Sequence, residues 1–433
     1  MPKFIIQDGY RHIGEFSIPE GKTTIGRGDT ATFRLKQDKG ISRLHCQVMR
    51  TKDKVTIEDL NSRNGTFVNS MPIHVPIELR HLDTVQINNI LLSYSEDDDK
   101  NENTNHDMAP QKSEKDNIDF LVSIVEKLKN NISKVVRGKD DVITKVLIAF
   151  LCDGHVLLED VPGVGKTKLA RTLARSLRTV FKRIQFTPDM LPNDITGVSI
   201  FNEAIHGFSF IPGPIFGNVI LADEINRGTP RVQSSLLESM AEGKVTVDSV
   251  SHILNKPFFV IATQNPADFH GTYPLPEAQL DRFLMKLNMG YPDEDAEIDI
   301  LNNQMTEDPI NHIERVTNSN EILLCQNIVR NIHVSPQVKN YIVTLVRETR
   351  KHPAFIYGAS PRASLALMRA SQCQAAMNGR DHVLPRDARD LAVDVLSHRL
   401  PLRLQARAEW NNSTNVLQSI IEHLPMERWE KIK

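Results

Sequence analysis

The spacing of hydrophobic and polar positions changes along the chain, and at the start it indicates strands. Up to residue 97, short runs such as KVTIEDL and DTVQINNILLSY alternate apolar and polar residues, with turn signals such as Asn64-Gly65 between the runs. Alternation over so few residues is typical of strands with one buried face. We therefore predict a small all-β sandwich or barrel over residues 1–97.

A polar stretch follows this β-rich part. The segment SEDDDKNENTNHDMAPQKSEKDN, residues 95–117, has no aromatic and no β-branched aliphatic side chain. Such a segment cannot bury enough apolar surface to offset the entropy lost on ordering it. We predict a flexible acidic linker over residues 98–117.

From Ile118 onward the pattern favours helices and then a mixture of strands and helices. IDFLVSIVEKLKNNISKVV has apolar residues at helical spacing, and the runs HVLLED, NVILADE and FFVIATQN then alternate with helical stretches. Such alternation is typical of a parallel sheet that is flanked by helices. We predict an α/β core over residues 118–292 and a predominantly helical domain over residues 293–433, so the chain is multidomain.

Composition narrows the classes of protein only a little. The chain has 433 residues, of which 40% are hydrophobic and 24% charged, with a formal net charge of −2, which is ordinary for a soluble globular chain. Because no basic excess is present, a nucleic-acid partner is not expected. No run of 18 apolar residues and no signal pattern appears, so we expect no membrane span and a cytoplasmic location.

The cysteines do not indicate a metal site. Cys46, Cys152, Cys325 and Cys373 are far apart in the sequence and form no C-x-x-C pair. A zinc site or a redox motif is therefore not expected. Reduced thiols in a cytosolic protein are the simplest interpretation.

The stretch LLEDVPGVGKTK carries the first candidate chemistry. GVGKT lies between a strand-like run and a helical run, which is the context that a phosphate-binding P-loop requires. The glycines let backbone N–H groups turn toward a phosphate at the N-terminus of the helix. Lys166 would reach the β- and γ-phosphates of ATP, and Thr167 would hold Mg²⁺. The candidate ATP-binding residues are Val161, Pro162, Gly163, Val164, Gly165, Lys166 and Thr167.

One position departs from the P-loop pattern. G-x-x-x-x-G-K-[ST] has a glycine five residues before Gly165, and here that residue is Asp160. Aspartate tolerates the left-handed conformation better than most residues. Glycine is therefore not strictly needed there, and we expect the carboxylate of Asp160 to point away from the phosphates, because a close approach would be repulsive.

Two further strand-like runs end in polar residues. NVILADEIN carries Asp223-Glu224 at its end, and FFVIATQN ends in Asn265. The carboxyl ends of parallel strands face the crevice in which α/β sheets bind ligands. We expect Asp223 to assist Mg²⁺, Glu224 to orient or polarise the attacking water, and Asn265 to hold that water or the γ-phosphate.

The order of these motifs resembles one branch of a large ATPase superfamily. VLLEDVPGVGKT, QFTPDMLPNDITG, GPIFGNVILADEINR, ATQNP, GTYPLPEAQLDRF and GASPRA follow one another as in the MoxR branch of the AAA+ ATPases, across roughly residues 118–405. The resemblance implies an ATP-hydrolysing α/β core with a P-loop, on which the helical domain forms a lid.

The resemblance also assigns roles to single residues. It makes Asp223-Glu224 the Walker B pair and Asn265 the sensor-1 residue. It makes Arg282, in LDRF, the arginine finger and Arg362, in GASPRA, the sensor-2 residue on the lid. Arginines at these places would offset the charge on the γ-phosphoryl oxygens in the transition state.

An arginine finger implies assembly, because it reaches the ATP of a neighbouring subunit. AAA+ proteins commonly form hexameric rings, and MoxR-type proteins often work with a von Willebrand factor A partner as chaperone-like maturation factors. Arg227 and Arg231 compete with Arg282 for the intersubunit role. A salt bridge from Arg282 to Asp281 is the structural alternative.

The run GVSIFNEAIHGFSFIPGPIF reads as a hairpin. Ile200, Phe208 and Phe210 are its apolar strand positions, and His206-Gly207 lies near the turn. In related ATPases such an insert faces the pore or a partner. A surface hairpin without contacts is the alternative.

The β-rich segment has its own constellation. Gly26-Arg27, then Ser42 and His45, then the run NSRNGTFVN follow one another. This G-R, S-x-x-H, N-G-T-x-x-N order resembles the forkhead-associated (FHA) domain across residues 1–97. FHA domains bind phosphothreonine peptides with loops at one end of a β-sandwich, and the resemblance gives His45 a structural role in those loops.

The candidate phosphopeptide-binding residues suit a phosphate. Phosphothreonine carries about −1.5 to −2 charges and three acceptor oxygens. Arg27 and Ser42 would bind the phosphate, Arg43 and Arg63 would add positive charge, and Asn64 would hold the peptide backbone. Turn residues on an inert β domain are the alternative interpretation.

Other functions stay open from the sequence. One is a phosphopeptide-binding adaptor with a nucleotide-binding but inactive ATPase fold, against which Glu224, Asn265 and Arg282 argue. A DNA-remodelling or chelatase-like motor is another, although no separate nucleic-acid module is visible. Thr104, in the acidic linker, is a candidate phosphothreonine for an FHA domain in cis or in trans.

Overall fold

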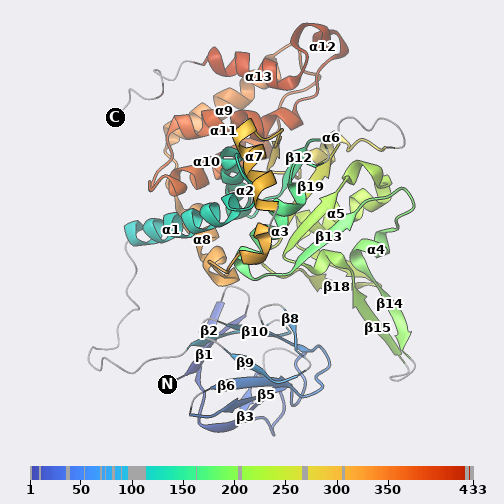
Figure 1. The fold of residues 1–433 in the computed structure, drawn as a ribbon, viewed down its shortest axis with the longest axis vertical. Helices are drawn as coiled ribbons and strands as arrows, with labels where there is room; N and C mark the ends of the chain where they lie inside the picture. The colour runs from blue at the N-terminus through green and yellow to red at the C-terminus, as the bar shows by residue number, and fades with distance from the viewer. Residues whose placement is uncertain are drawn as a thin grey trace. The chain divides into compact units, whose positions relative to one another are not determined.

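The chain forms two compact units, Met1–Pro110 and Gln111–Lys433, and each is described by itself (Figure 1). The computed structural model describes residues 2–8, 11–35, 40–52, 54–68, 71–73, 75–79, 83–88, 90–95, 114–161, 163–202, 207–265, 272–304, 308–424 and 429. Pro162, Thr104, His206 and most of the predicted linker lie outside these residues.

The first unit is a β-sandwich, as the alternating pattern predicts. Its two sheets have the strand orders β2-β1-β11-β10-β7-β8 and β4-β3-β5-β6-β9. Between them lie fully buried side chains such as Ile25, Val48, Ile57 and Tyr94. The strands are β1 Lys3–Asp8, β2 Arg11–Ser17, β3 Gly21–Gly26, β4 Phe33–Arg34, β5 Cys46–Arg50, β6 Val55–Asp59, β7 Thr66–Val68, β8 Met71–Pro72, β9 Ile77–Leu79, β10 Thr84–Ile87 and β11 Ile90–Ser95.

The second unit is built on a five-stranded parallel sheet of order β13-β16-β19-β12-β20. Its central strands are buried on both faces, since Val156 and Leu158 pack into one hydrophobic core, Leu157 packs into another, and none of the three has exposed surface. This explains their continuous apolar runs. All strands run in one direction, so their carboxyl ends meet at one edge. The strands are β12 Val156–Glu159, β13 Phe181–Gln185, β16 Val219–Asp223, β19 Phe259–Gln264 and β20 Met285–Leu287.

Helices cover this sheet (Figure 1). The first of them begins at Glu114, inside the segment predicted as linker. Acidic side chains such as Glu114 and Asp116 stabilise the N-terminus of a helix, where the helix dipole is positive, and this allows the helix to begin at Glu114. The helices of the core are α1 Glu114–Ser133, α2 Asp140–Leu151, α3 Lys166–Leu177, α4 Pro192–Thr196, α5 Pro230–Glu242 and α6 Glu277–Leu280.

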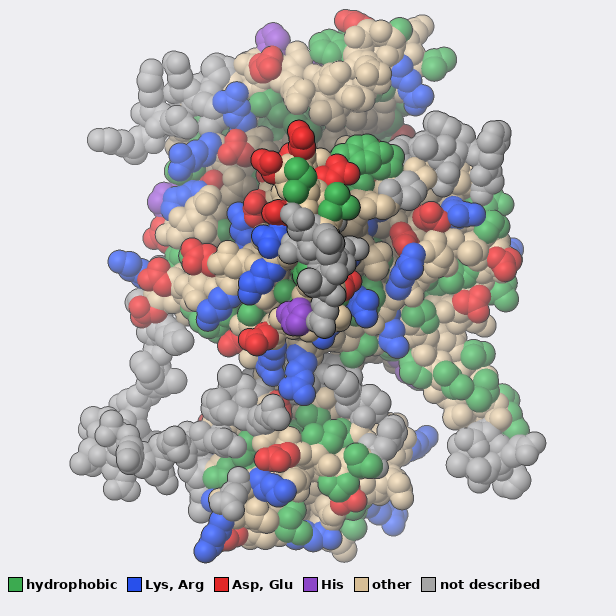
Figure 2. All heavy atoms as spheres, viewed as in Figure 1, with side chains coloured by type: hydrophobic (Ala, Val, Ile, Leu, Met, Phe, Trp, Pro, Cys, Tyr) green, Lys and Arg blue, Asp and Glu red, His purple; other side chains and the backbone are tan. Residues whose placement is uncertain are grey.

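The predicted hairpin is present as β14 (Gly197–Asn202) and β15 (Gly207–Pro212). It projects away from the sheet in Figure 1, and hydrophobic side chains gather along it in Figure 2. Phe208 is 75% exposed, whereas Phe210 stacks on His252 of a second hairpin with ring centroids 4.2 Å apart. That second hairpin consists of β17 Lys244–Val247 and β18 Val250–Ile253.

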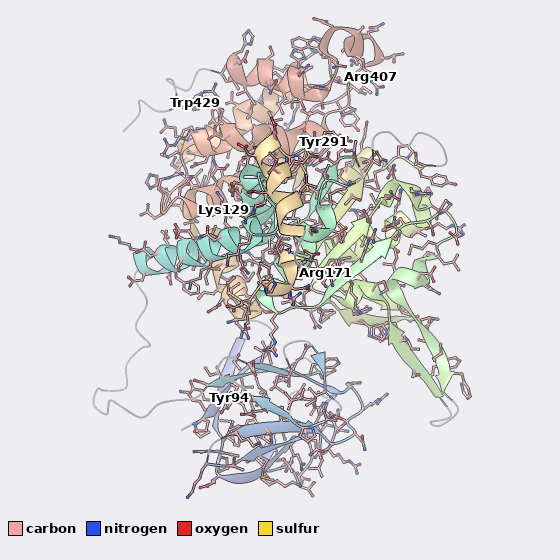
Figure 3. All side chains as sticks on the ribbon, viewed as in Figure 1. Tyr94, Lys129, Arg171, Tyr291, Arg407 and Trp429 are labelled. Atoms are coloured by element: carbon pink, nitrogen blue, oxygen red, sulfur yellow. The ribbon has the colours of Figure 1, made fainter. Side chains whose placement is uncertain are left out.

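The rest of the second unit is helical, as predicted. The caps follow the sequence: Asn318 begins one helix with a capping box to Glu321. Trp429, labelled in Figure 3, meets Tyr341 edge-on with ring centroids 5.6 Å apart. The helices are α7 Glu294–Gln304, α8 Ser319–Asn331, α9 Pro336–Lys351, α10 Pro361–Met377, α11 Pro385–Leu396, α12 Leu404–Trp410 and α13 Ser413–Glu422.

Three cysteines that are distant in the sequence gather where α2, α8 and α10 pack together. The Cys152 thiol donates to the carbonyl of Arg369, one turn before Cys373 on α10, at 3.3 Å. Burial and the neighbouring thiols of Cys152 and Cys325 raise the pKa of Cys373 well above its usual value. The separation of these residues in the sequence therefore does not predict their separation in space.

Among the described residues, no helix is long and apolar enough to cross a bilayer.

Candidate functional site

A cavity of 470 Å³ opens at the carboxyl edge of the parallel sheet. It brings together eight of the residues that the sequence singles out, namely Gly163, Val164, Gly165, Lys166, Thr167, Asp223, Glu224 and Asn265. Val161 does not line it, and Pro162 lies outside the described residues. The remaining lining comes from Val135, Val136, Arg137, Lys139, Lys168, Arg183, Gln185 and Pro292.

The loop between β12 and α3 has the backbone of a phosphate cradle. Gly163 and Gly165 have φ of 90° and 95°, in the left-handed region that favours glycine. Gly165 is the N-cap of α3, so the unpaired N–H groups of the first helical turn face the cavity together with the positive end of the helix dipole. This arrangement suits an anion such as the phosphates of a nucleotide.

Lys166 brings the cation. Its Nζ donates to the backbone carbonyl of Asp160 at 2.9 Å. Partial burial lowers the pKa of Lys166, while the carboxylates of Asp223, Asp160 and Glu224 oppose the shift.

Asp160 is a buried anchor. Its Oδ2 accepts the backbone N–H groups of Met289 and of Gly290, the latter at 2.9 Å, and its Oδ1 accepts the N–H of Val161 at 3.2 Å. The carboxylate thus turns toward the segment after β20, in the direction that repulsion from phosphates predicts. Tolerance of a left-handed backbone does not explain the aspartate, because Asp160 is not among the described residues with positive φ. Side-chain hydrogen bonding, and not backbone freedom, accounts for the aspartate.

The acidic pair at the end of β16 is held by a buried hydroxyl. Thr263 donates to Oδ1 of Asp223 at 2.7 Å and accepts the backbone N–H of Glu224 at 2.8 Å. Glu224 has φ 55° and ψ 50°, a left-handed conformation that is uncommon for this residue type. Thr263 has no exposed surface, so its two hydrogen bonds fix both acids at the cavity.

Side chains of β13 also reach the two acids. Arg183 donates to Oδ2 of Asp223, with Nη2 at 2.6 Å and Nε at 3.1 Å. Gln185 donates to Glu224 at 2.9 Å, and Arg227 pairs with the same carboxylate at 3.0 Å. Sequence reasoning missed Thr263, Arg183 and Gln185. The usable signal was their position at the carboxyl ends of strands that neighbour β16.

The two other predicted arginines do not line this cavity. Arg282 donates to the carbonyl of Leu237 at 2.5 Å. Arg362 lies 3.8 Å from Asp281 and exposes 57% of its side chain. Asp281 also pairs with Arg399, at 3.3 Å, so this acid is engaged by two arginines of the helical domain. The alternative salt bridge between Arg282 and Asp281 is therefore not formed, and Arg282 donates to a backbone carbonyl instead.

The first unit holds its candidate residues on loops at one end of the sandwich. The backbone N–H of Arg27 donates to the carbonyl of Ser42 at 3.0 Å, and the Ser42 hydroxyl accepts the N–H of Arg63 at 2.9 Å. Asn64 donates to the carbonyl of Gly40 at 2.9 Å. The loops that carry all these residues are therefore joined by hydrogen bonds.

His45 connects these loops through hydrogen bonds of its imidazole ring. It is fully buried, its Nδ1 accepts the N–H of Ser42 at 3.1 Å, and its Nε2 lies 3.0 Å from the carbonyl of Gly65. This is the structural role that the sequence predicts. The side chains of Arg27, Arg43 and Arg63 stay exposed around the loops, so this end of the sandwich offers positive charge to an anion.

Comparison with known proteins finds matches for both units. The ATPase family associated with various cellular activities (AAA) matches residues 155–285, the AAA lid domain matches residues 347–420, and the FHA domain matches residues 23–88. The FHA domain-containing protein FhaA of Mycobacterium tuberculosis is 43% identical over 58 residues, which are 13% of this chain and 11% of that protein.

Relatives of the second unit are matched along most of their length. YeaC of Bacillus subtilis is 48% identical over 310 residues, 71% of this chain and 97% of that protein. The chaperone MoxR1 of Mycobacterium tuberculosis is 38% identical over 310 residues, 70% of this chain and 82% of that protein. A crystal structure of a candidate ATPase from Cytophaga hutchinsonii is 37% identical, with a TM-score of 0.68 over 72% of this chain and 98% of that one. The chain therefore belongs to the MoxR family of AAA+ ATPases and is an ATP-hydrolysing enzyme with an FHA domain before its ATPase core and helical lid.

Proposed function

We propose that this ATPase works as a hexameric ring that hydrolyses ATP with Mg²⁺ to remodel or mature protein clients, and that phosphothreonine binding by its FHA domain recruits or regulates it. One observation carries the proposal: the cavity gathers the phosphate loop and both acids, while Arg282 and Arg362 lie outside it. A complete catalytic set then needs a second copy of the chain.

The oxygen donors of the cavity fit Mg²⁺. Thr167 offers a hydroxyl and Asp223 a carboxylate, and hard oxygen ligands of this kind suit Mg²⁺, directly or through water. When bound, the ion neutralises charge on the β- and γ-phosphates. Lys166 adds a positive charge next to the same phosphates.

Glu224 is the residue to orient or polarise the attacking water. The hydrogen bond from its backbone N–H to Thr263 holds Glu224 at the cavity, which Asn265 also lines, and this supports the assignment. Preorganised groups of this kind stabilise a transition state without having to reorganise during the reaction.

Arg282 and Arg362 would complete a neighbour's site. Arg362 is exposed and lies 3.8 Å from Asp281, the residue before Arg282, so the two cations come from segments that meet at this acid. Leu365, one helical turn after Arg362, is 54% exposed on the same face of α10, which suits an apolar contact between copies. An arginine supplied in this way raises phosphoryl-transfer rates by about 10³–10⁵.

The hairpin of β14 and β15 is our candidate contact for a protein client. Phe201 and Phe208 are 55% and 75% exposed, and their rings lie 5.6 Å apart. Exposed aromatic pairs mark surfaces that bind other proteins. A von Willebrand factor A partner belongs to the same proposal through the MoxR resemblance alone.

The FHA unit is our candidate reader of phosphothreonine. Three exposed arginines surround loops that Ser42 and His45 hold together. Charge-assisted hydrogen bonds from such groups are the strongest that a phosphate can receive in water. Recruitment through a phosphorylated partner follows.

The test separates the two units. Full-length Glu224→Gln should retain ATP and hold clients, and Arg27→Ala added to it should release the phosphorylated partners only. Peptide titration accompanies this: wild type should bind a phosphothreonine peptide, and Arg27→Ala should not, with ATP turnover unchanged. Equal affinity for the phosphorylated and the unphosphorylated peptide would contradict the FHA role, and identical recovery with both trap variants would contradict recruitment.

A further inference from the structure

Arg183 engages the carboxylate that the proposed function assigns to Mg²⁺. Its Nη2 and Nε both donate to Oδ2 of Asp223, at 2.6 and 3.1 Å. Oδ1 of Asp223 already accepts the hydroxyl of Thr263 at 2.7 Å. Both carboxylate oxygens therefore have protein donors, and the side chain of Asp223 is only 14% exposed.

Strand pairing fixes the guanidinium in this place. Strand β13 runs parallel to β16 with Gln185 opposite Asp223. Because side chains alternate along a strand, Arg183 and Gln185 share a face, and Nη2 of Arg183 donates to Oε1 of Gln185 at 2.7 Å. The guanidinium is thus held by two neighbours at the lining of the cavity.

A guanidinium and a divalent cation are rivals for the same carboxylate. Arginine stays protonated in proteins, so the rivalry cannot be relieved by loss of a proton. A metal that uses the carboxylate needs one of its oxygens, and two positive charges close together on one carboxylate repel each other.

We propose that Arg183 is a positioning residue that occupies Asp223 until Mg²⁺ replaces it, and that it thereby sets the Mg²⁺ concentration that nucleotide binding requires. The inference rests on the proposed function of Asp223 in holding Mg²⁺. It gives Arg183 a role apart from the phosphate loop, the acidic pair and the arginines of a neighbouring subunit.

The experiment measures binding rather than turnover. A fluorescent ATP analogue is titrated onto the full chain at fixed Mg²⁺ concentrations, with a chelator as the metal-free reference, in wild type, Arg183→Gln and Arg183→Lys. We expect Arg183→Gln to lower the Mg²⁺ concentration at half-saturation by about threefold to tenfold, the range expected for a partly exposed ion pair with a double hydrogen bond. Arg183→Lys keeps the positive charge but cannot make the double hydrogen bond of the guanidinium, so its Mg²⁺ concentration at half-saturation should lie between those of wild type and Arg183→Gln.

Arg227→Gln is the matched control, because it removes the same charge from a side chain that binds Glu224 and not Asp223. It should leave the Mg²⁺ requirement at the wild-type value. An unchanged requirement in both Arg183 variants, or an equal shift in Arg227→Gln, would overturn the inference. The inference would also be overturned if the Arg183 variants lose analogue binding equally with and without Mg²⁺, because that result would mean that Arg183 binds the phosphates directly. If wild type itself binds the analogue with no dependence on Mg²⁺, the proposed metal role of Asp223 fails instead.

Discussion

The aspartate that replaces glycine in the phosphate loop should matter for stability more than for nucleotide binding. Asp160 is 8% exposed, and Oδ2 accepts two backbone N–H groups, from Met289 and Gly290. In Asp160→Asn the side chain keeps its shape but has one accepting oxygen. If that oxygen stays on Met289 and Gly290, the amide group faces the N–H of Val161.

The size of the effect follows from these contacts. Two hydrogen bonds to a charged acceptor become bonds to a neutral one, which loses about 1 kcal/mol each, and one N–H without an acceptor costs about 1–3 kcal/mol. The expected loss for the ATPase unit is about 3–5 kcal/mol. Asp160→Gly removes every acceptor and should lose at least as much.

Tryptophan fluorescence during urea unfolding measures this loss in the right unit, because both tryptophans, Trp410 and Trp429, lie in Gln111–Lys433. We expect the urea midpoint of Asp160→Asn to fall by roughly 1 M. ATP affinity should change only a few fold, since Gly163, Gly165 and Lys166 are untouched, whereas Lys166→Ala should abolish binding. An unchanged midpoint together with lost ATP binding in Asp160→Asn would refute this account of the aspartate.

Three further outcomes follow from single side chains. Thr263→Val leaves Oδ1 of Asp223 and the backbone N–H of Glu224 without their hydroxyl partner, so it should lower kcat about 10- to 100-fold with little change in KM. Thr263→Ser restores the hydroxyl and should recover most of the lost kcat. A Thr263→Ser variant as slow as Thr263→Val would count against the role of the hydroxyl. Burial lowers the pKa of His155 to about 4, so between about pH 6.5 and pH 4 the unfolded chain binds a proton that the folded chain does not. The free energy of unfolding should therefore decrease as the pH is lowered through that window, by about 1.4 kcal/mol per pH unit. When the free energy of unfolding in urea is plotted against pH, His155→Gln should give a shallower slope than wild type, and equal slopes would contradict this. Phe208→Asp should keep basal turnover and reduce client recovery in the Glu224→Gln background; undiminished recovery would exclude the hairpin as the client contact.

The parts of the fold that depend on local pattern were predictable. Strands such as Val156–Glu159 are buried on both faces and read as apolar runs, and the polar residues just after them had to meet at the carboxyl edge of a parallel sheet. That rule predicts that Asp223, Glu224 and Asn265 lie close together, and all three line the cavity.

Contacts between distant segments were not predictable from the same pattern. Asp160 and Met289 are 129 positions apart, and Arg183 and Asp223 are 40 apart. Only the order of strands in the sheet places them together. The loop sequence alone therefore suggests only that Asp160 tolerates a left-handed backbone, whereas in the structure its carboxylate accepts two N–H groups from a distant segment.

The proposal that two subunits share each catalytic site is tested most directly by mixing two variants that should each be inactive. Lys166→Ala lacks the phosphate-binding cation, and Arg282→Ala lacks the arginine that we assign to the neighbour's site. Each should be inactive alone. In equal mixtures that are allowed to exchange subunits, about a quarter of the interfaces combine an intact Lys166 with an intact Arg282, so turnover should recover toward about a quarter of the wild-type rate. Wild-type turnover of Arg282→Ala alone, or no recovery at any mixing ratio, would contradict the account.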